Sequence, residues 1–290
     1  MTTKINQIPA PARTLARTMR WVVQHPGEIG RVARAFATNP VGTARALPGE
    51  YRQRRGQSIY GGSDWDDAWY EHLHGLLGAP WPCPEADQVK LLMTDINALL
   101  TEKGLRTGRG SYGWYSDAEI ALCSAIWCTV RHVKPEVVIE TGVAHGVSSR
   151  IILEGFSRND TGHLWSIDLP HPLDHSLHAQ TGAAVTDSCR PRWTYLEGES
   201  RRRLPPLVKE VGRLQLFVHD SLHTAENTLF EMEQAASIMS PGGVMLIDDI
   251  KGHAGFAEFA QRHPDYETIV CLTPDGGVGA FGIAVKMAAP

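Results

Sequence analysis

Carboxylates follow two successive apolar stretches in the last third of the chain. Asp220 ends LQLFVHD, and Asp248 and Asp249 follow GGVMLI. Apolar stretches of this kind are typical of neighbouring parallel strands, whose carboxyl ends lie on one edge about 5 Å apart. Three carboxylates there repel one another unless a cation joins them, and oxygen ligands favour Mg²⁺, Mn²⁺ or Ca²⁺. We therefore predict a metal site; helix capping or solvation of these aspartates is the alternative.

A glycine-rich turn is the second feature with chemical meaning. Residues 137–149 read VVIETGVAHGVSS, an apolar strand, two glycines and the start of a segment with helical spacing. Gly142 can adopt a positive φ and lets a ligand approach the backbone, and N–H groups at the start of the helix can bind a carboxylate. The turn lacks the G-x-G spacing of dinucleotide-binding proteins, which disfavours a dehydrogenase.

This turn, Glu140-Thr-Gly-Val-Ala-His-Gly-Val-Ser148, resembles the first motif of class I S-adenosylmethionine-dependent methyltransferases. The resemblance implies that Glu140 accepts a hydrogen bond from the ammonium group of the cofactor. Asp168, at the end of the next strand, can bind a ribose diol or cap a helix. The segment LEGES resembles the part of the family that contacts adenine. The predicted cofactor-binding residues are Glu140, Gly142, Gly146, Ser148, Asp168, Glu199, Ser200 and Asp220.

The acidic block resembles that of metal-dependent O-methyltransferases, particularly the branch with the sugar O-methyltransferases of macrolide biosynthesis. The shared pattern is Asp220-Ser-Leu-His223 followed by Asp248-Asp249, although Ser-Leu replaces the commoner Gly-Asp. The resemblance covers residues 112–286. It implies that the three aspartates bind the metal and that His223 is the general base. A cation lowers the pKa of a bound hydroxyl, and an ordinary histidine, with a pKa of about 6.5, accepts a proton at neutral pH.

The predicted function is a Mg²⁺-dependent transfer of a methyl group from S-adenosylmethionine to a hydroxyl of a sugar, polysaccharide precursor or glycosylated metabolite. Two adjacent acceptor oxygens could chelate the ion, so a phenol or catechol is the alternative acceptor. A non-catalytic protein that keeps the cofactor fold is the alternative class. Retention of His223 together with all three aspartates disfavours that class.

Several other residues near the motifs are weaker candidates for a functional role. His219, Glu226 and His253 are close enough in sequence to assist His223, but rank below it. His145 and His253 are expected at the surface. The aromatic segment 111–116 is a candidate lid over the cofactor, and packing in the core explains it equally well.

The elements that must position these residues alternate between strand and helix, which predicts an α/β protein. We expect a Rossmann-like class I methyltransferase fold with a mainly parallel seven-stranded sheet covered on both faces. TPDGG is too short for a crossover helix, so the last two strands should be antiparallel. The predicted strands are 137–140, 163–168, 193–198, 214–220, 242–248, 266–272 and 277–286. Predicted helices include 65–78, 85–104 and one beginning at Ser116, with Ser116 and Glu119 as a capping box.

Two domains are expected: an N-terminal helical extension over residues 1–110 and a cofactor-binding domain over 111–290. The extension begins with a basic arm, 1–55, and includes a linker, 48–65. The arm holds ten basic and two acidic residues although the whole chain has a net charge of -4. A solvated face or an acidic neighbouring subunit explains this charge better than a membrane surface, and we expect a homo-oligomer and no nucleic-acid partner.

The cysteines favour a reducing, cytoplasmic location. The chain has five, an odd number, and none forms a C-x-x-C pair. We therefore expect buried free thiols. No apolar segment approaches the about 18 residues of a spanning helix, and the N-terminus lacks the apolar region of a secretory signal.

Overall fold

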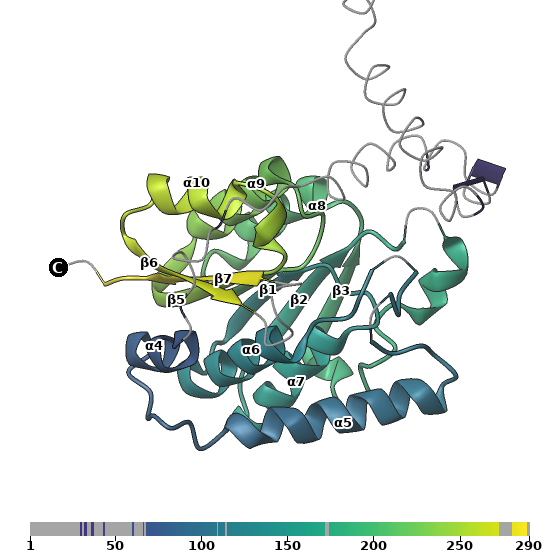
Figure 1. Ribbon diagram of the computed structural model, residues 1–290, viewed down its shortest axis with the longest axis horizontal. Helices are drawn as coiled ribbons and strands as arrows, with labels where there is room; N and C mark the ends of the chain where they lie inside the picture. Colours follow the sequence, from purple (N-terminus) through teal and green to yellow (C-terminus); the bar gives the residue numbers. More distant parts are fainter. Residues whose placement is uncertain are drawn as a thin grey trace, which may run out of the picture.

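The computed structural model describes most of the chain from Ala68 onward (Figure 1). The described residues are 30, 32, 33, 36, 37, 43, 60, 66, 68–108, 110–113, 115–171, 174–272 and 280–288. The predicted arm, 1–55, and linker, 48–65, therefore lie almost entirely outside the described residues. None of the helices in the described part combines the length and apolar composition needed to cross a membrane.

A seven-stranded sheet forms the centre of the protein, in the order β3-β2-β1-β4-β5-β7-β6. Neighbouring strands from β3 to β5 pair in parallel, and β7 is antiparallel to both β5 and β6. The strands are β1 (Val137–Thr141), β2 (His163–Asp168), β3 (Trp193–Glu197), β4 (Leu214–His219), β5 (Met239–Ile247), β6 (Tyr266–Leu272) and β7 (Ala280–Lys286). The predicted fold and the antiparallel last strand are confirmed.

Helices cover both faces of the sheet because successive strand residues point to opposite sides. Val138 packs in one hydrophobic cluster, and Ile139 in the other. The first face carries α6 (Ile120–Val133) and α7 (Val147–Asn159), with α5 (Ala86–Glu102) outside them (Figure 1). The second carries α8 (Ser200–Val211), α9 (Ala225–Ala236) and α10 (Gly255–Arg262) (Figure 1).

The helices before the sheet share its core. α5 contributes Leu92, Ile96 and Leu100 to the cluster that includes α6 and α7. Trp69 of α4 (Trp69–Leu76) contacts Phe281 of β7 edge to face, with ring centroids 5.1 Å apart. The domain boundary at residue 110 stays a prediction.

The predicted capping box before α6 is wrong. The helix begins at Ile120, and its N-cap is Glu119 with no side-chain capping bond. The Ser116 hydroxyl instead accepts a hydrogen bond from the backbone N–H of Gly110, at 3.0 Å. The residues between Ser116 and α6 are therefore not held in a capping box, and they can contact the glycine turn.

Candidate active site

The glycine turn and the first aspartate of the acidic block are in direct contact. Gly142 follows β1 with φ of 88°, and a Cβ atom there would lie 1.8 Å from the backbone carbonyl oxygen of Asp220. The N–H of Asp220 in turn donates to the carbonyl of Thr141 at 2.7 Å. Gly146, with φ of 82°, is the N-cap of α7. A side chain at position 142 would therefore separate the two parts of the predicted site.

A Gly142→Ala substitution tests this contact, with Gly108→Ala as its matched control. Gly108 has a similar φ of 81° but nothing within 4 Å of its hypothetical Cβ. The control should lose about 1–2 kcal/mol of stability from backbone strain alone. Gly142→Ala should lose about 1–3 kcal/mol more, because a backbone atom must move. Urea unfolding measures both, and equal losses would contradict the close packing.

Glu140 lies beneath the turn with its side chain fully buried. It accepts hydrogen bonds from the hydroxyls of Ser148 at 2.6 Å, Ser149 at 2.5 Å and Ser166 at 2.7 Å. Burial raises the pKa of Glu140 to about 7, although the three serine hydrogen bonds act in the opposite direction. In this arrangement Glu140 and Ser148 join β1, β2 and α7; their contact with a cofactor stays a prediction.

Burial of Glu140 predicts a specific pH dependence of stability. The pKa of about 7 exceeds the reference value of 4.5, so the folded state holds an extra proton between these pH values. The associated stability is fully present below the unfolded pKa and is lost as pH rises through about 7. It amounts to about 3 kcal/mol. Urea unfolding across this range should show a smaller loss in Glu140→Gln than in the unsubstituted protein; identical pH profiles would refute the raised pKa.

His145, expected at the surface, is fully buried, and this prediction is wrong. Its Nδ1 lies 2.9 Å from Oδ2 of Asp117, and its Nε2 lies 3.2 Å from Oε1 of Gln180. Burial lowers the pKa of His145, but the hydrogen bond and charge of Asp117 outweigh it and raise the pKa. Ser111 also donates to Asp117, at 2.6 Å.

The aromatic segment before α6 packs on this same part of the turn. The ring of Tyr112 contacts His145, and its hydroxyl hydrogen-bonds Thr181 at 2.6 Å. Asp117 thus connects the segment to the turn, a role that the sequence did not signal. The lid function of this segment stays a prediction.

Asp168 ends β2 beside the turn, and one of its carboxylate oxygens accepts from the backbone N–H of Val143 at 3.3 Å. Burial raises its pKa to about 7, assisted by the charges of Glu140 and Asp220. On neighbouring β3, the Tyr195 hydroxyl is buried without a hydrogen-bond partner among the described residues. A ligand hydroxyl at this edge would satisfy such groups, so the donor set fits a ribose.

Glu199 and Ser200, the predicted adenine contacts, lie at the start of α8. Glu199 is its exposed N-cap residue and pairs with Arg202 at 3.2 Å. The N–H of Gly198, the residue before Glu199, donates to the backbone carbonyl of Asp168 at 2.8 Å, and contact of Glu199 and Ser200 with adenine stays a prediction.

Two of the three predicted aspartates, Asp220 and Asp248, come together with His223 at the ends of β4 and β5. His219 pairs with Ile247, so Asp220 and Asp248 leave adjacent strands together. One ligand atom from each of Asp220, His223 and Asp248 lies within 4.8 Å of the others. The carboxylates of Asp220 and Asp248 offer the oxygen ligands that a hard divalent cation prefers, and the His223 imidazole lies beside them.

Asp249 occupies the edge of this cluster. Its side chain is 54% exposed, and its Oδ2 lies 3.9 Å from Nε2 of His223. Asp220 is closer, with Oδ1 3.5 Å from the same nitrogen. The geometric cluster thus contains His223 in place of Asp249, and metal binding by Asp249 stays a prediction.

The carboxylates control the charge of His223. Burial by itself lowers the pKa of His223, but the hydrogen bond of Asp220 and the charges of Asp249, Asp220 and Asp248 raise it to about 9. Burial and the charges of Asp220 and Asp249 also raise the pKa of Asp248. The cluster therefore attracts positive charge, from a proton on His223 or from a cation.

A buried polar network supports the cluster from α9. Glu231, fully buried, accepts hydrogen bonds from Thr141 at 2.5 Å, Ser221 at 2.8 Å and Asn227 at 2.9 Å. Its Oε2 also lies 2.7 Å from Nδ1 of His219. The network thus ties β1 and β4 to α9 immediately behind Asp220. Nothing in the sequence distinguished Glu231 from any other acidic residue within a helix, so this role was not predicted.

The structure also places the two remaining assisting candidates. His253, expected at the surface, is buried, which is a correction; burial lowers its pKa to about 3. Its Nε2 lies 3.4 Å from the Thr228 hydroxyl, which is 3.1 Å from His219. Glu226 instead points to the surface and pairs with Arg201. His253 is thus connected to the network through Thr228 and His219.

Comparisons with known proteins agree on the kind of domain. A family described as "Methyltransferase domain" matches residues 139–250, which contain the turn, the acidic block and the strands between them. No curated protein sequence matches the chain significantly.

Solved structures share the fold at low sequence identity. A Klebsiella pneumoniae protein assigned as an O-methyltransferase is 16% identical, covering 78% of this chain and 99% of its own, with a TM-score of 0.52. Cofactor-bound Rv0187 from MTB is 16% identical, covering 68% and 90%, with a TM-score of 0.50. The Streptomyces achromogenes O-methyltransferase TomG in complex with SAM is 14% identical, covering 68% and 90%, with a TM-score of 0.49.

Proposed function

We propose that this protein is an S-adenosylmethionine-dependent methyltransferase that methylates a hydroxyl oxygen beside the cluster of Asp220, His223 and Asp248. The methyltransferase-domain match over residues 139–250 and the shared fold support this activity. The observation that carries the proposal is the contact between Gly142 and Asp220. Gly142 belongs to the turn that would hold the donor, and Asp220 belongs to the cluster that would hold the acceptor. The two substrates would therefore meet across one short part of the sheet edge.

The residues of the glycine turn and the end of β2 would orient the methyl donor. The backbone at Gly142 and the start of α7 would receive the methionine part of the cofactor, and Asp168 with Tyr195 would face its ribose. The sulfonium is a good leaving group, so methyl transfer requires mainly that the acceptor oxygen lie in line with the sulfur–methyl bond. Packing of Tyr112 and Asp117 on His145 supports the shape of this turn.

A hydroxyl is a poor nucleophile while it keeps its proton, so the residues that bind the acceptor must remove that proton. Asp220 and Asp248 would hold a divalent cation, with Asp249 beside them, and Mg²⁺ is the ion we propose. When bound, the cation supplies positive charge that lowers the pKa of an adjacent hydroxyl and offsets the carboxylate field that keeps His223 protonated. His223 then accepts the hydroxyl proton as the methyl group leaves sulfur for oxygen.

The acceptor class we propose is a saccharide or glycosylated metabolite. Two neighbouring hydroxyls suit a site where two carboxylates leave room for further oxygen ligands around one ion. The Asp-x-x-His spacing followed by an acidic pair supports the sugar acceptor through its resemblance to macrolide sugar O-methyltransferases. The assignment of the Klebsiella pneumoniae protein favours oxygen as the methylated atom.

Labelled S-adenosylmethionine, incubated with a panel of sugars and catechols, tests the proposal. Labelled product should require Mg²⁺, and excess EDTA should reduce turnover by at least about 100-fold, with recovery on adding Mg²⁺ back. Calorimetric binding of S-adenosylhomocysteine should persist in EDTA, because the turn does not need the cation. Turnover that EDTA leaves unchanged would overturn the metal role, and a catechol preference would overturn the saccharide class.

A further inference from the structure

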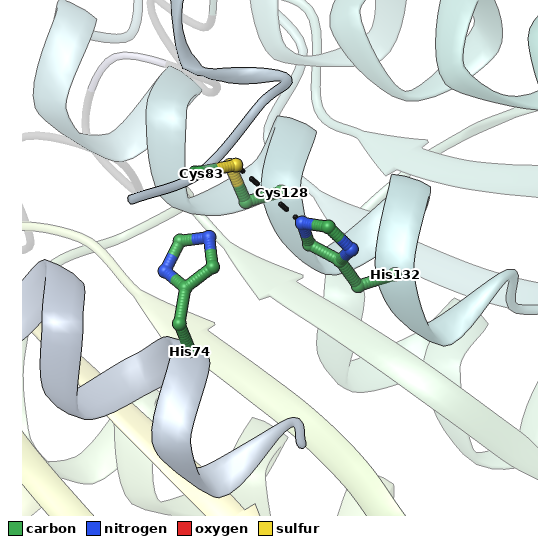
Figure 2. Close-up of side chains that lie close together, drawn as sticks. All are labelled: His74, Cys83, Cys128 and His132. Atoms are coloured by element: carbon green, nitrogen blue, oxygen red, sulfur yellow. Dashed lines mark hydrogen bonds between the residues drawn. The ribbon is translucent and has the colours of Figure 1, made fainter. Parts of the chain in front are cut away.

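Four potential metal ligands gather far from the acidic block along the chain. They are His74, Cys83, Cys128 and His132, whose side chains point toward one another (Figure 2). Each offers one ligand atom, and all four atoms lie within 4.8 Å of one another. His74 and Cys128 are fully buried, and Cys83 is 9% exposed.

The spacing of these atoms fits a small tetrahedral ion. Sγ of Cys83 lies 3.3 Å from Sγ of Cys128 and 3.4 Å from Nε2 of His132. Nitrogen and sulfur atoms that bind zinc tetrahedrally at about 2.0–2.3 Å lie about 3.3–3.8 Å from one another. The four residues therefore need only small side-chain movements to bind one ion.

The orientation of His74 points to a ligand. Its Nδ1 lies 2.6 Å from the backbone carbonyl of Tyr70. A carbonyl only accepts, so Nδ1 carries the proton and Nε2 has a free lone pair. Nε2 is buried and has no hydrogen-bond partner among the described residues. This is the arrangement by which metal-binding histidines are usually held, with the second ring nitrogen donating to an oxygen.

The local sequence brings the ligands together from three segments. His74 lies in the last turn of α4, Cys83 lies in the connection to α5, and Cys128 and His132 are one turn apart on α6. Residues four apart occupy the same helix face. The Tyr70 hydroxyl lies 2.8 Å from Sγ of Cys128 and can donate to a thiolate there.

We propose that His74, Cys83, Cys128 and His132 form a structural Zn²⁺ site. Two thiolates and two neutral imidazoles neutralise the ion and complete its tetrahedral coordination, leaving no position for a substrate. Binding would release the two thiol protons. The ion would join α4 and its following loop to α6, and so attach this part of the N-terminal extension to the methyltransferase domain.

This site is separate from the proposed active site. α6 ends at Val133, and β1 begins at Val137, so Cys128 and His132 lie toward the amino-terminal edge of the sheet. Gly142 and Asp220 lie at the carboxyl edge. Loss of one metal should therefore leave the other in place.

Metal analysis of the full-length, untagged protein purified under reducing conditions tests the proposal. We expect about one zinc per chain after removal of loosely bound metal. Replacement by Co²⁺ should produce thiolate-to-cobalt charge-transfer absorption and the strong visible bands of a tetrahedral ion. Cys128→Ser should lose both, whereas Cys271→Ser, which changes a buried thiol outside the cluster, should keep them.

Asp248→Asn separates the two metal sites and should keep the zinc and the cobalt thiolate spectrum. If Cys128→Ser does not fold, the spectrum of the unsubstituted protein still decides. Failure of that protein to bind equimolar zinc, or a cobalt spectrum without thiolate absorption, would overturn the proposal. A Cys83–Cys128 disulfide in protein alkylated at cell lysis would also overturn it.

Discussion

Replacing His223 with alanine should lower kcat by about 10²- to 10⁴-fold, the usual contribution of a general base. The expectation follows from its position, with Nε2 3.5 Å from Asp220 and the side chain only 10% exposed. The affinity for S-adenosylhomocysteine should change little, because the residues of the glycine turn are untouched. Steady-state kinetics with the best acceptor of the panel and calorimetry with S-adenosylhomocysteine measure the two effects.

His163→Ala is the control for this substitution. His163 begins β2, at the opposite edge of the sheet from Asp220, and its ring contacts the Thr194 hydroxyl at 2.8 Å. Its removal should leave kcat within about twofold, because His163 lies far from the reacting atoms and contacts none of the residues of the cluster. Turnover in His223→Ala equal to that of the control would remove His223 from the mechanism.

Glu231→Ala should destabilise the protein by about 3–5 kcal/mol, because each buried donor left without its acceptor costs about 1–3 kcal/mol. Burial raises the pKa of Glu231, but the charge and hydrogen bond of His219 outweigh it and lower the pKa to about 2. The carboxylate is therefore ionised in the folded protein at neutral pH. The substitution would leave buried donors on Thr141, Ser221 and Asn227 without their acceptor.

Glu226→Ala on the same helix provides the matched comparison. Glu226 pairs with Arg201 at the surface, where such pairs contribute about 0–1 kcal/mol. Guanidinium unfolding at neutral pH compares the two variants. The stability that ionised Glu231 contributes is fully present above about 4.5, the pKa of this glutamate in the unfolded chain. It is lost as the pH falls toward about 2, the pKa in the folded protein. Equal losses from both substitutions would show that the network does not stabilise the strand ends.

Residue patterns close together in the sequence were sufficient to predict the sheet. Each predicted strand corresponds to an observed one, because an apolar run bounded by turn residues is by itself typical of a buried strand. The short connection after Leu272 predicted the antiparallel β7 for a similarly local reason. The glycine turn and the paired aspartates were also predictable, since strand ends of a parallel sheet share an edge.

Contacts between distant segments decided what local patterns could not. The sequence placed His145 at the surface, yet Asp117 and Gln180 reach it from two other segments and bury it. Glu231 acquired its role only when α9 packed behind β1 and β4.

By itself, then, the sequence determined the strands, the glycine turn and the edge at which the chemistry would lie. Tertiary structure alone decided which charges are buried together, and it brought Cys83 and His74 to Cys128, 45 residues from Cys83 along the chain. The physical reason is that burial and pairing of polar groups depend on which helix faces pack together, and spacing along one segment does not specify its partner.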